Sequence, residues 1–332
     1  MQLKQYNNML DQSFFKNTKT EIKKIHDLED DLILDSRNNM QRIFNQIRAD
    51  LKKYNFDSNK VREILSHYED DIKAVIKNSV RKTTNTFGQW NRNKFNYKNK
   101  QPVYKVVSIK SEYNDEYIDY VDNFTDQQLD FILNTSIVDY IDIINRNTTH
   151  IQETIGNIQG RIDKLQENPI KNANKIKELE ARLDEAVIQN LFIRNVDKSL
   201  QNNDKARSDL RGEFLVTTTS NAIRQKEVEQ MNKKQSLLFP SPDESFIDGT
   251  VVGGIIAVGL FGGRAINEVM TKTWESVIDS KTRPAHALAN QQQVNYNDYF
   301  IVGGEYARYP MDENLSMENK INCRCKVIFD FK

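Results

Sequence analysis

The residue types best suited to chemistry lie near the C-terminus, where His286 precedes Cys323 and Cys325, the only two cysteines of the 332-residue chain. Thiolate and imidazole groups bind zinc, and a thiolate beside a histidine base can act as a nucleophile. The two cysteines are one residue apart, so they cannot form a disulfide framework, and a bridge between them would be strained. This pattern suits a reducing compartment.

Polar residues surround this histidine in the sequence. Asp279 and Arg283 are four residues apart, a spacing that places an ion pair on one face of a helix. Pro284 indicates that such a helix ends there, so His286 is expected to begin a loop. Polar side chains with fixed partners hold irregular segments together. We therefore favour a hydrogen-bonded structural cluster of Asp279, Arg283 and His286.

Two alternatives stay open for the same segment. His286, Cys323 and Cys325 could form a metal site, although Cys-x-Cys spacing suits tetrahedral zinc less well than Cys-x-x-Cys and a fourth ligand is not evident. A cysteine–histidine catalytic pair is the other alternative, but nothing marks either cysteine as exposed at a helix N-terminus. The sequence also has no Walker lysine loop, dinucleotide glycine fingerprint or His-Glu-x-x-His helix. We expect neither enzymatic activity nor a cofactor.

The elements that must position these residues are mainly helical. Apolar residues recur every three or four positions from Leu3 to Leu34, as an amphipathic helix requires. Asp35 or Ser36 is expected to cap a second helix, and a third follows through Ile76. Three antiparallel helices are therefore predicted for the N-terminal region.

A stricter apolar rhythm predicts an antiparallel helical hairpin over residues 151–191. Apolar residues follow a 4-3-4-3 spacing before the break at Asn168-Pro169 and resume afterwards, at Ile151, Ile155, Ile158, Ile162, Leu165, Ile176, Leu179, Leu183 and Ala186. Pro169 disfavours a continuous helix. Each arm is too short for a free-standing coiled coil, so we expect it to pack on its own domain or on a neighbouring subunit.

The composition changes after a last long helix, which is expected over residues 205–232. A segment with two prolines, residues 237–248, reads as a linker and leads into the apolar, glycine-rich run 251–263. This run has 13 residues, fewer than the roughly 20 that a membrane-spanning helix needs. We expect a buried segment rather than a stable membrane span, with transient membrane contact as the alternative.

A basic and aromatic stretch, residues 81–100, carries the strongest local charge. The interval 72–111 contains ten Lys or Arg residues and no acidic residue, whereas 112–142 contains nine acidic residues and no basic residue. Basic side chains neutralise phosphates and aromatic rings stack on bases, so a tentative DNA surface comprises Arg81, Lys82, Trp90, Arg92, Lys94, Lys98 and Lys100. The alternative is that aromatic residues such as Phe87 belong to the core and that the acidic stretch pairs with the lysines.

Overall composition places the chain in the mainly α class. Lys plus Arg and Asp plus Glu both number 47, so the net charge gives no overall attraction to nucleic acid or to an anionic membrane. Glycine and proline number only 12 and 6, which favours long helices. We expect a helical region over residues 1–204 and a smaller α+β domain over residues 205–332. The first 20 residues lack the apolar run of a secretory signal, so synthesis in the cytoplasm is expected.

The order of residues in the C-terminal segment resembles the Mu F-like family of bacteriophage head proteins. The matching features are Trp274, the Asp-x-x-x-Arg-x-x-His element of Asp279, Arg283 and His286, Tyr309-Pro310, and the closing Asn322-Cys323-Arg324-Cys325. The upstream range 211–221, with Thr217, Thr218 and Ser220, resembles the helix that begins this family's domain. The resemblance covers residues 207–329. The interval between Asn221 and Trp274 is longer than the family pattern and contains the apolar run.

This resemblance implies a structural role without catalysis. It implies a minor capsid protein of a tailed bacteriophage, located in the virion head near the portal and in the host cytoplasm during assembly. The implied partners are the portal protein, capsid or scaffolding proteins and packaged double-stranded DNA, in head morphogenesis, packaging or DNA ejection. A sequence-nonspecific DNA-binding protein that protects packaged ends is the alternative, and a metal-dependent enzyme is a third.

Overall fold

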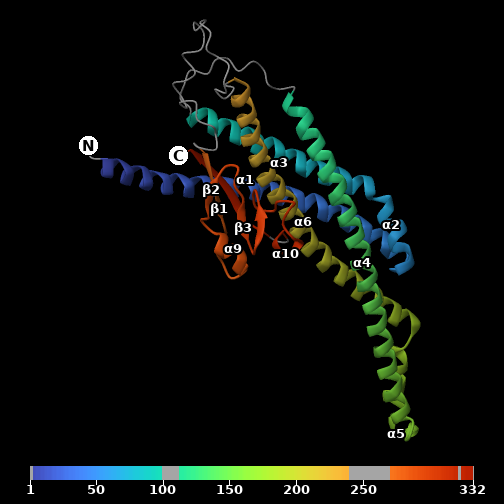
Figure 1. The fold of residues 1–332 in the computed structure, drawn as a ribbon. Coiled ribbons are helices and arrows are strands. Elements are labelled where there is room, and N and C mark those ends of the chain that lie inside the picture. The colour runs from blue at the N-terminus through green and yellow to red at the C-terminus, as the bar shows by residue number, and fades with distance from the viewer. Residues whose placement is uncertain (1–2, 99–111, 239–269, 321–322, 332) are drawn as a thin grey trace, which may run out of the picture. The chain divides into compact units, whose positions relative to one another are not determined.

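The computed structural model describes residues 3–98, 112–238, 270–320 and 323–331, with side chains described except at 3–19, 92–98, 112–116, 230–238 and 331. The described chain is mainly α-helical with a few short antiparallel strands near its C-terminus (Figure 1). The helices are α1 (Leu3–Lys53), the 3-10 helix η1 (Ser58–Lys60), α2 (Val61–His67), α3 (Glu69–Lys98), α4 (Glu112–Leu165), α5 (Pro169–Arg182), α6 (Glu185–Leu238), α9 (Pro284–Ala289) and α10 (Met317–Lys320). The strands are β1 (Met270–Glu275), β2 (Gln293–Asn295), β3 (Phe300–Val302), β4 (Glu305–Ala307) and β5 (Lys326–Phe331).

Contacts divide the chain into two units. The sheet unit comprises Met1–Leu34, Ser79–Tyr117 and Glu213–Lys332, and the helical unit comprises Asp35–Asn78 and Ile118–Gly212. The sequence predicts two domains that meet at residue 204, each formed by one continuous stretch of the chain. The observed units interleave because α1, α3, α4 and α6 each contribute residues to both.

The first helix is longer than expected. α1 continues through Asp35 and Ser36, where a cap was predicted, and Ser36 is buried within it. No glycine or proline occurs between Leu3 and Lys53, so nothing in the backbone forces a break. The predicted start of the last long helix at residue 205 is also wrong, because α6 begins at Glu185. Here too, no glycine or proline interrupts the sequence between 185 and 205.

The helical unit is held together by antiparallel helix pairs. Lys73 and Lys77 of α3 form ion pairs with Asp126 and Asp122 of α4, at 2.7 and 2.6 Å respectively. The acidic stretch of α4 therefore neutralises lysines of α3, as the charge reversal in the sequence suggested. Apolar residues from four long helices fill the core between them, including Ile47, Ile76, Ile132 and Val196.

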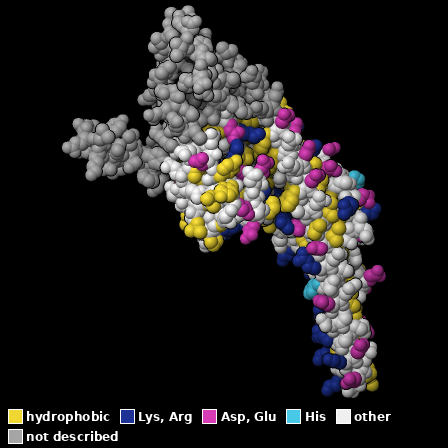
Figure 2. All heavy atoms as spheres, viewed as in Figure 1, with side chains coloured by type: hydrophobic (Ala, Val, Ile, Leu, Met, Phe, Trp, Pro, Cys, Tyr) yellow, Lys and Arg dark blue, Asp and Glu magenta, His cyan; other side chains and the backbone are white. Residues whose placement is uncertain are grey.

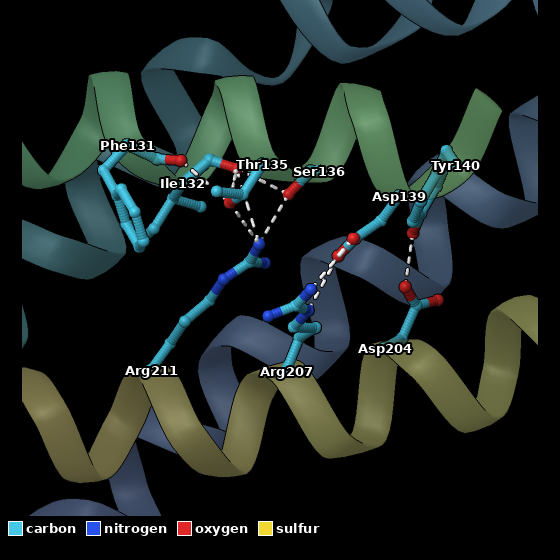
Figure 3. Close-up of polar contacts among 9 residues, drawn as sticks. All are labelled: Phe131, Ile132, Thr135, Ser136, Asp139, Tyr140, Asp204, Arg207 and Arg211. Carbon is cyan, nitrogen blue, oxygen red and sulfur yellow. Dashed lines mark hydrogen bonds and ion pairs between the residues drawn. The ribbon is translucent and has the colours of Figure 1, made fainter. Parts of the chain in front are cut away.

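A partly buried polar network joins α4 to α6 in this unit (Figure 3). Arg207 donates two hydrogen bonds to Asp139, at 2.7 and 2.9 Å. Arg211 donates to the hydroxyls of Thr135 and Ser136, and Tyr140 donates to Asp204 at 2.5 Å. Successive residues along α4 contact successively earlier residues of α6, so the two helices are antiparallel.

The end of α4 and α5 form a helical hairpin within the predicted range 151–191. Ile158, Ile162 and Leu179 are buried in its seam, with Leu165, Ile176 and Leu183 packed against them. Pro169 occupies the first turn of α5, where a missing N–H costs nothing. Ala186 lies outside this seam, because the chain turns at Leu183 and Ala186 is exposed in α6.

In the sheet unit, β1 is the central strand of an antiparallel sheet with order β2-β1-β5. Trp274 of β1 lies opposite Val327 of β5. A second hairpin joins β3 and β4 through Gly303 and Gly304, whose positive φ angles of 60° and 84° suit a two-residue turn. Trp274, Phe300 and Phe329 lie in the core of this unit.

None of the described helices is long and apolar enough to cross a membrane. The apolar run 251–263 lies outside the described residues, so its predicted burial stays a prediction.

Candidate functional site

The sheet register brings the C-terminal motif residues together. β5 pairs with β1 over its full length, which places Cys325, the residue before β5, next to Ser276, the residue after β1. The Cys325 thiol lies 3.3 Å from the Ser276 hydroxyl. Trp274 is the fully buried residue near the end of β1. Asn322, also part of the predicted motif, lies outside the described residues.

His286 is the centre of this site. Its Nδ1 atom lies 3.3 Å from the Cys325 sulfur and 3.5 Å from the Cys323 sulfur. Both cysteines thus reach one imidazole, although a residue separates them in the sequence. Arg324, between them, points instead to Asp279. His286, Cys323 and Cys325 are each only 3% exposed.

The other imidazole nitrogen faces Arg283. The Arg283 Nη1 atom lies 3.2 Å from His286 Nε2. A guanidinium can only donate, so Nε2 accepts and a neutral imidazole carries its proton on Nδ1. That proton points to the two sulfur atoms. The favoured link between Arg283 and His286 is therefore present in the structure.

Asp279 does not belong to this cluster as expected. Arg324 Nη2 donates to both carboxylate oxygens of Asp279, at 2.8 and 2.7 Å, and this ion pair lowers the pKa of Asp279. The predicted pairing of Asp279 with Arg283 is therefore wrong. The reason is local, because Arg283 occupies the N-cap position of α9, Pro284 begins that helix rather than ending one, and His286 lies inside α9 rather than in a loop.

Hydrogen bonds to Ser276 hold the imidazole in place. The Ser276 hydroxyl donates to the backbone oxygen of His286 at 2.7 Å and accepts from the Trp274 indole at 3.1 Å. Trp274 also contacts the imidazole edge to face, with 6.0 Å between ring centroids. The imidazole is thus carried by α9 and the two thiols by the segment before β5, and Trp274 of β1 packs against the imidazole.

The two thiols share their protons unequally. Hydrogen bonding from Cys323, aided by His286 and Ser276, lowers the pKa of Cys325, whereas the same contact and burial raise the pKa of Cys323. Both cysteines are buried, whereas a nucleophilic thiolate needs to be accessible, so the geometry gives the thiol-nucleophile alternative no support.

Helix α6 also contacts the site. The Asn221 side chain of α6 donates to the backbone oxygen of Cys325 at 3.1 Å, and the Thr218 hydroxyl donates to the Met311 sulfur at 3.4 Å. Thr217 and Ser220 are buried too. The polar run 217–221 thus packs against the strands, which explains such residues inside a helix.

Sequence reasoning missed a second buried polar group in the sheet unit. Glu29 of α1 pairs with Lys326 of β5 and accepts from Ser220, and both members of the ion pair are 2% exposed. Arg224 donates to the Val327 backbone oxygen, and burial lowers its pKa to about 10. No spacing rule links residues 29 and 326, so only the acidic and basic positions inside apolar stretches hinted at this pair.

The basic and aromatic stretch divides between surface and core. Arg81 and Lys82 are exposed on α3, whereas Phe87 is fully buried and Trp90 is half-buried beneath the Arg224 guanidinium, 5.6 Å from its ring centroid. Phe87 therefore cannot stack on a base. The side chains of Arg92, Lys94 and Lys98, and all of Lys100, lie outside what the structure describes.

Elsewhere the visible surface is mixed in charge. Figure 2 shows Lys and Arg side chains interspersed with Asp and Glu along the hairpin of α4 and α5. Such a surface favours no single type of charged partner.

The comparisons with known proteins give no relative. No family model, no curated protein and no solved structure matches the chain.

Proposed function

We propose that the chain is a structural minor protein of a tailed-bacteriophage head, associated with the portal and of the Mu F-like kind. The supporting observation is the convergence of the motif residues. Trp274, Arg283, His286, Cys323 and Cys325 are spread over some fifty positions of sequence, yet they lie in one cluster around a single imidazole.

The position of the cluster favours a structural role. Except for the partly buried Arg283, its side chains are buried, and they join β1, α9 and the segment before β5, so they stabilise the sheet unit rather than face a substrate. Residues that hold a domain together are expected in a protein whose activity is assembly. The proposed partners are the portal protein and capsid or scaffolding proteins.

Contact with packaged DNA is part of the proposal. Arg81 and Lys82 are exposed on α3 and suit phosphate contacts without sequence preference. Because Phe87 is buried, it cannot stack on bases, so the proposed contact is one of basic side chains with phosphates.

Purified particles test the proposal. We expect mass spectrometry to find the chain in mature heads and proheads of the phage that encodes it, and to find it bound to portal rings isolated from a prohead lysate. The association should survive DNase treatment, because protein contacts hold it. Absence of the chain from both heads and proheads would contradict the proposal, and loss on DNase treatment alone would favour the DNA-binding accessory protein.

A matched pair of variants sharpens the assay. Trp274→Ala removes the central core residue of the small domain, whereas Ile170→Asp changes a side chain that is 95% exposed at the hairpin. If the sheet unit makes the portal contact, Trp274→Ala should abolish incorporation of the chain into heads, whereas Ile170→Asp should not. If both variants are incorporated equally, the portal contact would instead lie on the helical unit.

A further inference from the structure

We propose that His286, Cys323 and Cys325 bind one zinc ion. The inference concerns this cluster alone and holds whether or not the chain is a head protein. Among the described residues this is the only group of His, Cys, Asp and Glu side chains that could hold a metal, and its three ligand atoms all lie within 4.8 Å of one another. Two sulfurs and one imidazole nitrogen form a donor set that zinc prefers.

The distances from the imidazole to the two sulfurs fit a tetrahedral ion. Zinc bonds of about 2.3 Å to sulfur and about 2.0–2.1 Å to nitrogen place neighbouring donor atoms roughly 3.5–3.8 Å apart. The observed distances from His286 Nδ1 to the two sulfurs are 3.3 and 3.5 Å. Little movement would therefore be needed to bring an ion into bonding range.

The ligands are held before any ion binds. The Cys325 backbone oxygen accepts from Asn221, and the Cys325 residue leads directly into β5. The His286 backbone oxygen accepts from Ser276, and α9 fixes the imidazole against Trp274. Such preorganisation lowers the entropy cost of assembling the site.

Arg283 distinguishes a zinc site from a plain hydrogen-bonded cluster. Coordination through Nδ1 moves the imidazole proton to Nε2, which then needs an acceptor. Arg283 supplies a donor at 3.2 Å, so it must turn away when zinc binds. Arg283→Gln replaces that donor with a side chain whose oxygen can accept from Nε2. The substitution should therefore leave zinc binding unimpaired or strengthen it.

The fourth ligand position falls to a small molecule such as water. The described group supplies three ligand side chains, and the Ser276 hydroxyl, 3.3 Å from Cys325, is already engaged with the His286 backbone. Three protein ligands and one exchangeable ligand are an established zinc arrangement.

The test uses the full chain, purified without a histidine tag under reducing conditions. We expect elemental analysis to find one zinc per chain, and the cobalt-substituted protein to show a thiolate-to-cobalt charge-transfer band. Cys323→Ser, Cys325→Ser and His286→Ala should each weaken zinc binding at least tenfold in competition with a chromophoric chelator. Arg283→Gln should bind zinc as tightly as the wild type or more tightly.

Val327→Ala is the matched control. It removes buried volume from β5 beside the site without removing a ligand, so it should lower the melting temperature and retain zinc. Circular dichroism establishes which variants are folded before their metal content is compared. A folded wild type that takes up no zinc and shows no charge-transfer band would overturn the proposal. So would folded cysteine variants that keep wild-type affinity, or an Arg283→Gln variant that loses zinc.

Discussion

The buried ion pair between Glu29 and Lys326 leads to the sharpest stability prediction. Both side chains are 2% exposed, so neither charge can be hydrated if its partner is removed. Breaking a buried pair in this way costs about 3–5 kcal/mol. We expect Lys326→Met to lower the free energy of unfolding of the sheet unit by that amount. At about 2–4 °C per kcal/mol, its melting temperature should fall by roughly 6–20 °C.

Removing both charges should cost far less. In the double variant Glu29→Met with Lys326→Met no buried charge is stranded, and apolar replacement of a buried pair is often neutral or stabilising. The Ser220 hydroxyl, which donates to Glu29, also donates to the Thr217 backbone oxygen at 3.1 Å and so keeps an acceptor. The double variant should therefore recover most of the lost stability.

Tryptophan fluorescence can follow this unit alone. The two tryptophans of the chain, Trp90 and Trp274, both belong to the sheet unit, so their emission on thermal or denaturant unfolding reports that unit. Arg308→Met is the matched control, because Arg308 pairs with Glu229 in the same unit but is half exposed. Its loss should cost about 1 kcal/mol or less. The reasoning fails if Lys326→Met costs no more than Arg308→Met, or if the double variant is as unstable as the single one.

Three further predictions concern the helical unit and the basic stretch. Ile158→Asp places a charge in the hairpin seam and should speed hydrogen exchange of α5, whereas Ile170→Asp, at a 95% exposed site, should not; equal exchange would refute the packed seam. Burial raises the pKa of Asp204 from 3.8 to about 6, so its stabilising contribution is full below about pH 4 and is lost as the pH rises through 6. Acidification from pH 7 to 5 should thus stabilise the helical unit by about 1 kcal/mol through this group, and an unchanged pH dependence of the melting curve in Asp204→Asn would contradict this. If the basic stretch contacts DNA, its alanine variant should show a smaller salt slope in fluorescence anisotropy than the wild type, and identical slopes would exclude the contact for Arg81, Lys82, Arg92, Lys94, Lys98 and Lys100.

Sequence reasoning worked best where short-range periodicity determines structure. The apolar spacing predicted helices and the seam around Ile158 and Leu179, because a 3.6-residue turn places such residues on one face whatever the surroundings. It failed at Asp35, since a possible N-cap residue begins a new helix only where its own backbone leaves the helical conformation. Pro284 was misread similarly, because proline fits the first turn of a helix as readily as it ends one.

By itself, the sequence determined the mainly helical class, the hairpin and the residue types of the C-terminal cluster, all of which depend on local spacing and composition. Only the tertiary structure decided which of those residues meet. Strand pairing of β1 with β5 brings Cys325 to His286, and Asp279 pairs with Arg324 instead of the nearer Arg283. The pairing of Glu29 with Lys326 likewise joins positions separated by almost the whole chain. Such contacts depend on how helices and strands pack in three dimensions, and no short-range pattern in one sequence specifies that packing.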